Sequence, residues 1–307
     1  MAPLPLPING RIVVDGIDPE RSTIFKSNLL PLRLWFTCPP SAVEQEDESR
    51  LVTDGELPRP EYPLIFKNGD DLRQDQLVVQ LFTLMNRLLL KENLDLRIKT
   101  YSVLATGLEE GMIEFVPSLT LAAAMSEHGS LQGYLRANHP DVGSPATFGI
   151  SPRVLDTFVR SCAGYCVLTY ILGVGDRHLD NLMLAPDGHF FHVDFGYILG
   201  RDPKPFPPPV KLSREMIDAM GGPLSAHYLR FKSLCHTAFA NLRKQANLIL
   251  NLVGLMVDSG VQDIKLEPDK AVAKVSPLGR ALQSARPLIP VTSSLPARRS
   301  RTTFSCT

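Results

Sequence analysis

The sequence predicts an α+β chain with two lobes, a small β-rich N-terminal lobe and a larger helical C-terminal lobe. Three observations support this prediction. The chain has 307 residues, and a length near twice ~150 residues favours two lobes or domains. Up to residue 116 the segments are short and rich in β-branched and aromatic residues, as strands are. From residue 118 onward, longer segments carry apolar residues at helical spacing.

The N-terminal lobe, residues 1–116, is expected to consist of strands and one long helix. Segments rich in Val, Ile, Leu and Phe alternate here with Asp-Pro and Leu-Pro breaks, which are typical of turns between strands. The predicted strands cover residues 12–17, 23–27, 32–36, 62–67, 97–105 and 111–116.

The helix of this lobe is predicted directly after residues 62–67. Asp70 and Asp71 stand at its expected start, where carboxylates cap a helix and interact favourably with its dipole. Leucines then recur at the spacing of one buried helical face; they are Leu77, Leu81, Leu84 and Leu88.

The C-terminal lobe is expected to be mainly helical with one hairpin. The predicted helices cover residues 119–127, 129–137, 152–173, 214–220 and 227–257. Ser151 before Pro152 is typical of a helix start, because serine caps the helix and proline fits its first turn. The turn APDGH between 182–184 and 190–193 predicts a β-hairpin. The prolines of 201–212 exclude a regular element there, because they lack the backbone donor.

The C-terminal lobe is expected to span residues 117–275. Two segments are predicted to lie outside the packed lobes. Residues 38–60 contain six acids and two arginines, and we expect a solvated, flexible insertion loop. Residues 276–307 contain five arginines and no acid. This Ser-, Thr- and Pro-rich composition predicts a disordered basic tail, with contact to anionic lipid as the alternative.

Charge and composition exclude several classes of protein. Lys+Arg and Asp+Glu both number 32, and a net charge of zero argues against a nucleic-acid binder. Five cysteines without metal-ligand spacing indicate a reduced, intracellular chain. The N-terminal MAPLPLPINGR lacks the pattern of a signal peptide, and no apolar run reaches the ~18 residues of a membrane span. We therefore expect a cytoplasmic protein without a nucleic-acid partner.

The residues with catalytic chemistry are concentrated between 172 and 200. Asp176 is followed five residues later by Asn181, and Asp194 opens an Asp-Phe-Gly sequence thirteen residues further on. Protein kinases use an acid, an amide and an Asp-Phe-Gly acid in this order. A hairpin between the last two brings both to one metal, and Mg²⁺ or Mn²⁺ prefers such oxygen ligands, shared with phosphates. The order Asp-Arg-His differs from the His-Arg-Asp of ordinary protein kinases.

A kinase also needs a cation at the ATP phosphates, and Lys67 at the end of a predicted strand occupies the expected place. Asp75, in the helix that follows, either orients Lys67 or joins the nucleotide pocket. The chain has neither a GxxxxGK[ST] loop nor a GxGxxG loop. In their place, Ser27 and Lys26 are candidates to meet phosphates through hydroxyl, backbone N–H and ammonium groups.

Three stretches resemble the catalytic domain of the phosphatidylinositol 3-kinases: DDLRQDQL (70–77), SCAGYCVLTYILGVGDRHLDNLML (161–184) and FHVDFGYILGRDPKPFPPPVKL (191–212). The resemblance is best to class III, the vacuolar-sorting and autophagy type, and runs from about residue 3 to residue 275. It implies the two-lobed, protein-kinase-like fold of the phosphatidylinositol 3- and 4-kinases. The 38–60 loop is longer than usual, and after EPDKAVAKV the tail replaces the expected closing helices.

The resemblance implies a role for each matching residue. Ser27 and Lys67 would contact the ATP phosphates, and Asn181 and Asp194 would hold the metal. Tyr101 and Asp75 would line the inner adenine pocket. The hinge that binds adenine would consist of Glu114, Phe115 and Val116. Asp176 or His178 would handle the proton of the inositol hydroxyl, and the choice of base stays open between them. Arg177 would support the catalytic loop.

The same resemblance implies the substrate. The activation segment runs from Asp194 to about Asp218. Relatives that accept polyphosphorylated inositides carry clustered basic residues there, whereas this chain has only Arg201, Lys204 and Lys211, spaced among prolines. Few cations suit a headgroup with a single phosphodiester. We therefore expect phosphatidylinositol as substrate and its 3-phosphate as product. The implied setting is peripheral, on endosome and autophagosome membranes, with a regulatory protein-kinase-like subunit and autophagy or endosomal regulators as partners.

Two other functions stay open on the sequence. Phosphatidylinositol 4-kinases and large Ser/Thr kinases share the Asp-Arg-His and Asp-Phe-Gly pattern, although segment 201–212 argues against them. A catalytically impaired regulatory or truncated isoform that still binds nucleotide is the alternative from another class, since the closing helices are not recognised. Every catalytic side chain that the pattern requires is present, so the sequence favours an active lipid kinase.

Overall fold

A computed structural model describes residues 2–26, 29–39, 61–208, 210–256 and 259–265. Ser27, most of the predicted 38–60 loop and the whole of the predicted 276–307 tail lie outside these residues. The predictions made for those three therefore stay predictions. Within the described residues, no helix combines the length and the apolar character needed to cross a membrane.

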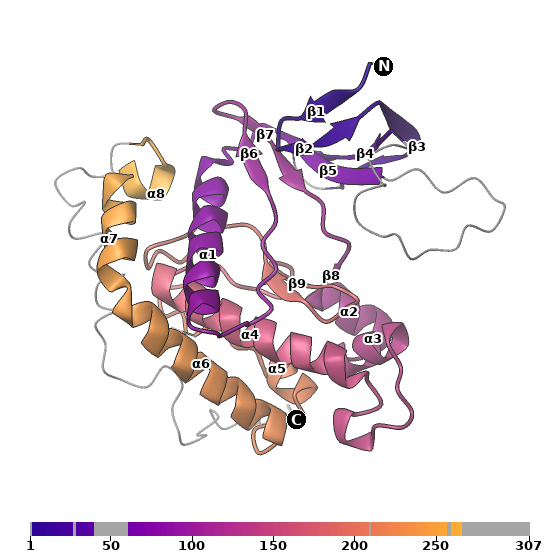
Figure 1. Ribbon diagram of the computed structural model, residues 1–307, viewed down its shortest axis with the longest axis vertical. Helices are drawn as coiled ribbons and strands as arrows, with labels where there is room; N and C mark the ends of the chain where they lie inside the picture. The colour runs from indigo at the N-terminus through magenta and orange to yellow at the C-terminus, as the bar shows by residue number, and fades with distance from the viewer. Residues whose placement is uncertain (1, 27–28, 40–60, 209, 257–258, 266–307) are drawn as a thin grey trace, which may run out of the picture.

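The N-terminal lobe is built on an antiparallel five-stranded sheet (Figure 1). Its strand order is β3 (Gly16–Ile24), β4 (Leu32–Thr37), β5 (Glu61–Asn68), β7 (Glu110–Glu114) and β6 (Val103–Ala105). A hairpin of β1 (Leu4–Leu6) and β2 (Asn9–Val14) lies beside it. A small cluster of buried apolar residues, among them Leu6, Val14 and Leu64, packs this end of the lobe.

Helix α1 (Arg73–Lys91) is the predicted long helix of this lobe, but its buried face differs from the predicted one. Leu77 and Leu81 of the predicted face are buried, which confirms its first half, whereas Leu84 and Leu88 are half-buried. The most deeply buried residues are Val78, Phe82, Met85 and Leu89. The buried face is therefore wider than the predicted stripe and shifted in its second half, because α1 packs against both β6 and α6. The predicted carboxylate cap is wrong for Asp70, whereas Oδ1 of Asp71 accepts the N–H of Arg73, the first residue of the helix, over 3.1 Å. The N-cap residue itself is Leu72.

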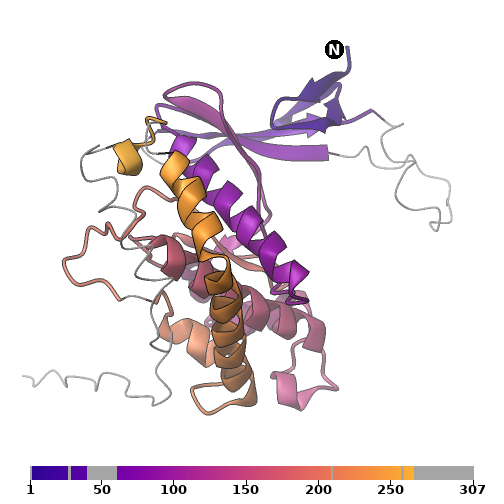
Figure 2. The same cartoon turned by 60° about the vertical axis from the view of Figure 1, so that its left-hand side comes forward.

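The C-terminal lobe is mainly helical, as predicted. Its helices are α2 (Leu121–His128), α3 (Leu131–Asn138), α4 (Pro152–Leu172), α5 (Arg214–Ala219), α6 (Ala226–Lys244), α7 (Ala246–Leu255) and α8 (Gln262–Lys265), with a 3₁₀ turn at Pro145–Thr147. Helix α4 is buried along almost its whole length, against α6 and strand β10. This arrangement makes α4 the centre of the lobe, as Figure 2 shows.

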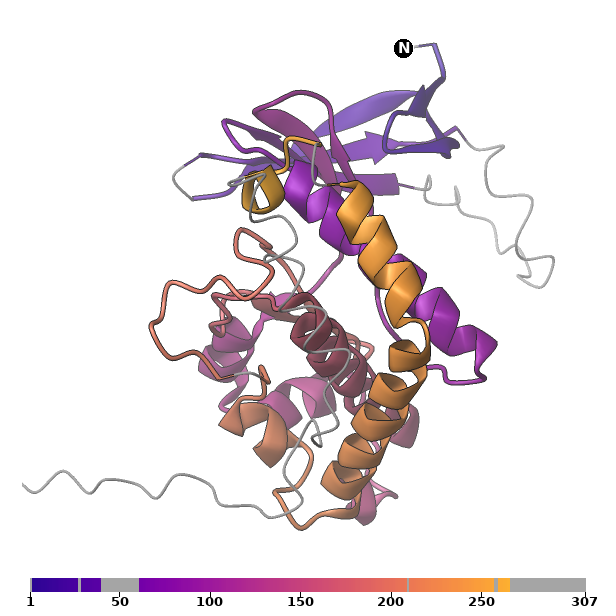
Figure 3. The same cartoon turned by 90° about the vertical axis from the view of Figure 1, so that its left-hand side faces the viewer.

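A three-stranded antiparallel sheet joins the helical lobe to the site. Strand β9 (Leu182–Leu184) pairs with β10 (Phe190–His192), which confirms the predicted hairpin, and with the short β8 (Leu119–Thr120). The described part of segment 201–212 forms neither helix nor strand, as its prolines predict. This segment projects as a salmon loop on the left of Figure 3.

Two predicted elements are interrupted. Only residues 103–105 of the predicted 97–105 strand pair with a neighbour. Arg97 has a left-handed φ of 50°, and its N–H donates to the Asp95 carboxylate over 2.8 Å, so the chain turns there. The predicted 227–257 helix breaks at Gln245, between α6 and α7. Because of this break, α6 lies on α4 while α7 and α8 rise toward the β-rich lobe (Figures 1 and 3).

Candidate active site

A cavity of about 390 Å³ lies between the two lobes. Residues of β5, α1 and β7 line it from the N-terminal lobe, and residues of β8, α2, β9 and β10 line it from the helical lobe. The fold brings to this cavity seven of the predicted site residues, which are Lys67, Asp75, Tyr101, Glu114, Phe115, Val116 and Asp194. The described residues predicted for the nucleotide pocket, together with Asp194, therefore line one continuous cavity.

The backbone of residues 114–116 forms the narrow connection between the lobes. Glu114 ends β7, and its Oε2 accepts the N–H of Ser102 over 2.9 Å, while its own N–H donates to the Ser102 carbonyl. The N–H of Phe115 donates to Pro63 over 3.2 Å. Within the described residues, the N–H of Val116 has no protein acceptor. This edge therefore offers a free backbone donor to the cavity, suited to an adenine nitrogen.

Lys67 is held by Asp70, a partner that the sequence did not predict. Their Nζ and Oδ2 atoms lie 2.7 Å apart. Both side chains are half-exposed, so this ion pair contributes little to stability, but it keeps the ammonium at the cavity. Lys67 also lies close enough to Asp75 to lower the pKa of that carboxyl.

Asp75 lines the cavity without binding Lys67 directly. Its Oδ1 accepts the backbone N–H of Phe195 over 3.1 Å, so an acid in the first turn of α1 holds the Asp-Phe-Gly backbone. Burial raises the pKa of Asp75 to about 6, against the lowering effects of the Phe195 hydrogen bond and of Lys67. Of the two roles left open by the sequence, the geometry supports lining the pocket.

Tyr101 closes the inner end of the cavity. Its hydroxyl donates to the carbonyl oxygen of His192 over 3.2 Å, and its ring meets Phe191 edge-on. Burial raises the pKa of Tyr101 well above its ordinary value, so the phenol stays protonated and keeps donating. This bond joins the N-terminal lobe to strand β10.

Arg177 connects the catalytic loop to the Asp-Phe-Gly segment. Its Nε donates to the Gly175 carbonyl over 2.8 Å and one terminal nitrogen to the Val193 carbonyl over 2.6 Å. The other terminal nitrogen donates to the carbonyl of Asp194. Because one guanidinium satisfies three backbone acceptors, Arg177 fixes both segments at once.

Asp176 and Asn181 are held within the same loop. The Nδ2 of Asn181 donates to the backbone carbonyl of Asp176 over 3.0 Å, and the N–H of Val193 donates to the carbonyl of Asn181 over 3.1 Å. Asp176 has φ 50°, in the left-handed region. Such strain is found at functional sites and needs surrounding bonds to hold it.

Phe195 is anchored in the core and thereby turns Asp194 toward the cavity. The Phe195 ring is fully buried and meets the Phe82 ring of α1 edge-on, with centroids 5.4 Å apart. The carbonyl of Phe195 accepts from Nε2 of the buried Gln74 over 2.8 Å. Asp194, by contrast, is exposed and has φ 62°. Burial of one residue thus fixes the direction of its neighbour.

The oxygen donors of this site fit a hard divalent cation bound together with phosphates. Because Asn181 donates through Nδ2, its Oδ1 is turned the other way and is available as a ligand. Asp194 accepts one backbone N–H at Oδ1, over 3.3 Å from Gly196, and keeps Oδ2 for a ligand. In the described residues no group of three or more His, Cys, Asp or Glu side chains could hold a metal alone, so Mg²⁺ or Mn²⁺ would take its remaining ligands from substrate oxygens.

His178 is exposed beside this site. Its Nδ1 accepts the N–H of Asp180 over 3.3 Å. In this tautomer Nε2 carries the ring proton, so Nε2 accepts a substrate proton only in the other tautomer, with the proton on Nδ1. Asp176 is half-buried, and both residues stay candidates for the base.

Comparison with known proteins identifies the family. The sequence profile of "Phosphatidylinositol 3- and 4-kinase" matches residues 61–142 and 122–266. The chain belongs to this family. It is 56% identical to "Phosphatidylinositol 3-kinase pik3" of Schizosaccharomyces pombe over 89% of this chain and 32% of that protein. It is 54% identical to "Phosphatidylinositol 3-kinase VPS34" of Arabidopsis thaliana, over 89% and 31%.

A third relative gives the same result. "Phosphatidylinositol 3-kinase VPS34" of Saccharomyces cerevisiae is 50% identical over 89% of this chain and 29% of that protein. The chain thus spans about a third of the length of the curated relatives it matches. The predicted resemblance and the two-lobed fold class are confirmed.

The activation segment of this family member holds the three predicted headgroup cations in different ways. Arg201 pairs with the buried Asp263. Lys211 pairs with Asp202 over 3.2 Å, and its side chain is only 9% exposed. Lys204 is exposed, and within the described residues its ammonium has no carboxylate partner. Of the three, Lys204 is the one whose charge is free for a lipid headgroup.

The sequence did not reveal three buried polar residues that hold this site, Gln74, Asp202 and Asp263. Each of them forms a hydrogen bond with a backbone group of the site. Asp263 of α8 accepts the N–H of Ile198 over 2.9 Å, and its own N–H donates to Oε1 of Gln74 over 3.0 Å. Their sequence contexts contain no motif that indicates these partners, which lie far away in the chain.

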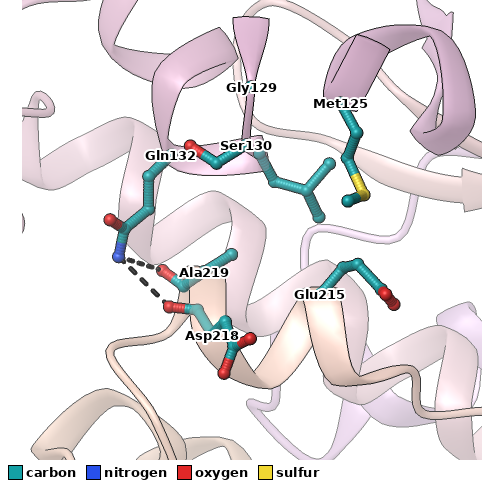
Figure 4. A pocket seen from close by; sticks show the side chains of 8 residues that line it. Met125, Gly129, Ser130, Gln132, Glu215, Asp218 and Ala219 are labelled. Carbon is teal, nitrogen blue, oxygen red and sulfur yellow. Dashed lines mark hydrogen bonds between the residues drawn. The ribbon is translucent and has the colours of Figure 1, made fainter. Parts of the chain in front are cut away.

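A second, smaller cavity of about 190 Å³ lies among α2, α3 and α5 (Figure 4). Gln132 of α3 donates from Nε2 to the carbonyl oxygens of Asp218 and Ala219, over 3.2 Å each. These bonds satisfy carbonyls at the C-terminal end of a helix, where intrahelical partners are missing. They hold α5, the last part of the activation segment, against α3. No predicted site residue lines this cavity.

Proposed function

We propose that this chain is a phosphatidylinositol 3-kinase catalytic domain, which transfers the γ-phosphoryl group of ATP to the 3-hydroxyl of phosphatidylinositol. One observation carries the proposal: the cavity between the lobes joins the free hinge donor at Val116, the ammonium of Lys67 and the carboxylate of Asp194. The names of the relatives support the same reaction.

The nucleotide would lie with its adenine at residues 114–116 and its phosphates near Lys67. Lys67 would leave Asp70 for the phosphates, since phosphate oxygens offer an ammonium a stronger partner than a half-exposed carboxylate. Asn181 and Asp194 would hold Mg²⁺ or Mn²⁺. When bound, the metal would neutralise charge on the transferred phosphoryl group.

The remaining task of the protein is positioning, which supplies most of the catalysis in phosphoryl transfer. Arg177 keeps the catalytic loop and the Asp-Phe-Gly segment in one geometry through three carbonyl oxygens. Asp176 or the imidazole of His178 would accept the proton of the attacking inositol hydroxyl. The hydroxyl oxygen would then bond to the γ-phosphorus as the bond to ADP breaks.

The lipid would approach at the activation segment, where Lys204 offers a free cation for the single phosphodiester. The class III resemblance further supports peripheral association from the cytoplasm with endosome and autophagosome membranes. A regulatory protein-kinase-like subunit and autophagy or endosomal regulators are the proposed partners.

The test is transfer of ³²P from ATP to vesicle phosphatidylinositol by the purified chain, with Mg²⁺ or Mn²⁺. We expect labelled lipid from the wild type and at least a ~100-fold loss in Asp194→Asn. Glu127→Gln is the matched control, because Glu127 is an exposed acid of α2 outside the cavity. Mg-ATP binding without lipid labelling by the wild type would reject the kinase and favour the impaired, nucleotide-binding alternative.

A further inference from the structure

The base of the activation segment contains a buried ion pair that the proposed reaction does not use. The Oδ2 atom of Asp202 lies 3.2 Å from Nζ of Lys211, and the two side chains are 5% and 9% exposed. The segment 203–210, of which the structure describes 203–208 and 210, lies between them in the chain and would face the proposed lipid. The carbonyl of Lys211 is also fixed, since Sγ of Cys166 in α4 donates to it over 3.6 Å.

Asp202 also binds the catalytic loop directly. Its Oδ2 accepts the backbone N–H of Asp176 over 3.1 Å, and its Oδ1 accepts the N–H of Lys204 over 2.9 Å. One carboxylate thus binds a backbone N–H of the catalytic loop, a backbone N–H at the start of the lipid-facing loop and the Lys211 ammonium at the end of that loop. Burial alone would raise the pKa of Asp202, but these hydrogen bonds and the Lys211 charge lower it below its ordinary value.

The two segments are in backbone contact beside this carboxylate. The N–H of Gly175 donates to Tyr197 over 2.8 Å, and the N–H of Gly200 donates to Gly173 over 2.9 Å. A Cβ at Gly175 would lie 2.0 Å from the carbonyl oxygen of Arg201. Glycine is therefore required for an approach this close, and a change in the 197–202 backbone must move the catalytic loop.

Asp176 needs such a support because its backbone is strained. With φ 50° it occupies the left-handed region, which residues other than glycine adopt at a cost. A hydrogen bond from its N–H to a buried carboxylate is charge-assisted and stronger than a neutral one. The Asp202 bond therefore stabilises the conformation in which Asp176 is presented to substrate.

We propose that Asp202 and Lys211 are a positioning pair: Asp202 holds the backbone of Asp176, and Lys211 closes the lipid-facing loop 203–210 onto the same carboxylate. In this proposal, which rests on the proposed function, Lys211 acts inside the protein and does not bind the lipid headgroup. The geometry of loop 203–210 is thereby coupled to that of the catalytic residue.

The test compares Asp202→Asn, Lys211→Met and the double variant in the full chain. An asparagine has one acceptor oxygen where the carboxylate has two, so at least one of the three donors loses its partner. We expect each single variant to lower kcat by ~10- to 100-fold, the effect of a small misplacement. The KM for vesicle phosphatidylinositol and the Kd for Mg-ATP should stay within about twofold, because neither binding surface changes. The double variant should be no worse than the poorer single one, since both break one interaction.

Two further variants separate positioning from loss of folding or of charge. Lys211→Arg keeps a cation for Asp202 and should recover most of kcat. Lys91→Met removes an exposed lysine at the end of α1, far from the pair, and is the control for charge. A raised KM for phosphatidylinositol in Lys211→Met alone, additive with the Asp202→Asn effect, would overturn the proposal and make Lys211 a headgroup ligand.

Hydrogen–deuterium exchange tests the pair without relying on lipid kinase activity. Peptides covering 172–181 and 203–210 should both exchange faster in Asp202→Asn and in Lys211→Met than in the wild type or in Lys91→Met. This result would support the pair even if the wild type labelled no lipid, in which case only the proposed function would fail. Unchanged exchange of 172–181 in both variants would overturn the pair.

Discussion

The carboxylate of Asp75 accepts the backbone N–H of Phe195 over 3.1 Å. This bond joins the first turn of α1, in the β-rich lobe, to the Asp-Phe-Gly segment of the helical lobe. It places an ionisable group with a pKa of about 6 at the back of the nucleotide cavity. The stability of the protein must therefore depend on pH through Asp75.

Asp75→Asn is expected to stabilise the nucleotide-free protein near neutral pH. The folded-state pKa of Asp75 is raised from 3.8 to about 6, so ionisation costs stability that grows as pH rises from about 4 to about 6 and is constant above. The gain should not exceed about 3 kcal/mol, at about 1.4 kcal/mol for each pKa unit. Urea unfolding of both proteins between pH 4 and 8 measures it. A gain that is largest at pH 4 would contradict the assignment.

Lys67→Met should weaken Mg-ATP binding by at least ~10-fold and turnover by ~100-fold, because it removes the cation at the phosphates. Asp70→Asn is the informative comparison. It removes the carboxylate that Lys67 contacts but keeps the ammonium, so the affinity for Mg-ATP should stay within about threefold or increase. Calorimetric titration with Mg-ATP measures both variants. Equal losses in the two would show that Asp70 itself is needed for binding.

Arg177→Met should destabilise the fold and abolish most activity. The substitution leaves the carbonyl oxygens of Gly175, Val193 and Asp194 without their donor. Water can satisfy the exposed Asp194 carbonyl, whereas each unsatisfied buried acceptor costs about 1–3 kcal/mol. We expect a loss of about 3 kcal/mol in unfolding free energy. Arg153→Met, an exposed position at the start of α4, is the control. Similar losses in the two variants would refute the bridging role.

Gly175→Ala should destabilise the protein by about 1–3 kcal/mol, as overpacking does. A Cβ at Gly175 would lie 2.0 Å from the Arg201 carbonyl oxygen, so the backbone must move. Gly254→Ala is the matched control in α7, where a Cβ meets no atom within 4 Å; it should stabilise the helix by up to ~1 kcal/mol. Thermal unfolding of the two variants measures both effects. An unchanged stability of Gly175→Ala would contradict the close backbone contact.

Much of the fold could be predicted because its elements are specified locally. The APDGH turn and its flanking apolar residues predict the β9–β10 hairpin, which the structure confirms. The failures occur where tertiary contacts decide. The buried face of α1 includes the predicted Leu77 and Leu81 but not Leu84 and Leu88, because the helix packs on both lobes. The strand before residue 103 is replaced by a turn that depends on Asp95 and Arg97.

The candidate site shows the same division. Asp176, Asn181 and Asp194 are specified by residue type and spacing, so a motif finds them. Gln74 and Asp263 act on backbone groups 121 and 65 residues away in the chain, those of Phe195 and Ile198. No local pattern encodes such a contact, because it exists only after segments far apart in the chain have packed together.

The position of phosphorylation on the inositol ring distinguishes a phosphatidylinositol 3-kinase from a 4-kinase. The purified chain is incubated with Mg-ATP and phosphatidylinositol vesicles, and the deacylated product is separated by chromatography from 3- and 4-phosphate standards. We expect the 3-phosphate alone, lost in Asp194→Asn and retained in Glu127→Gln. A 4-phosphate product, or label that persists in Asp194→Asn, would contradict it.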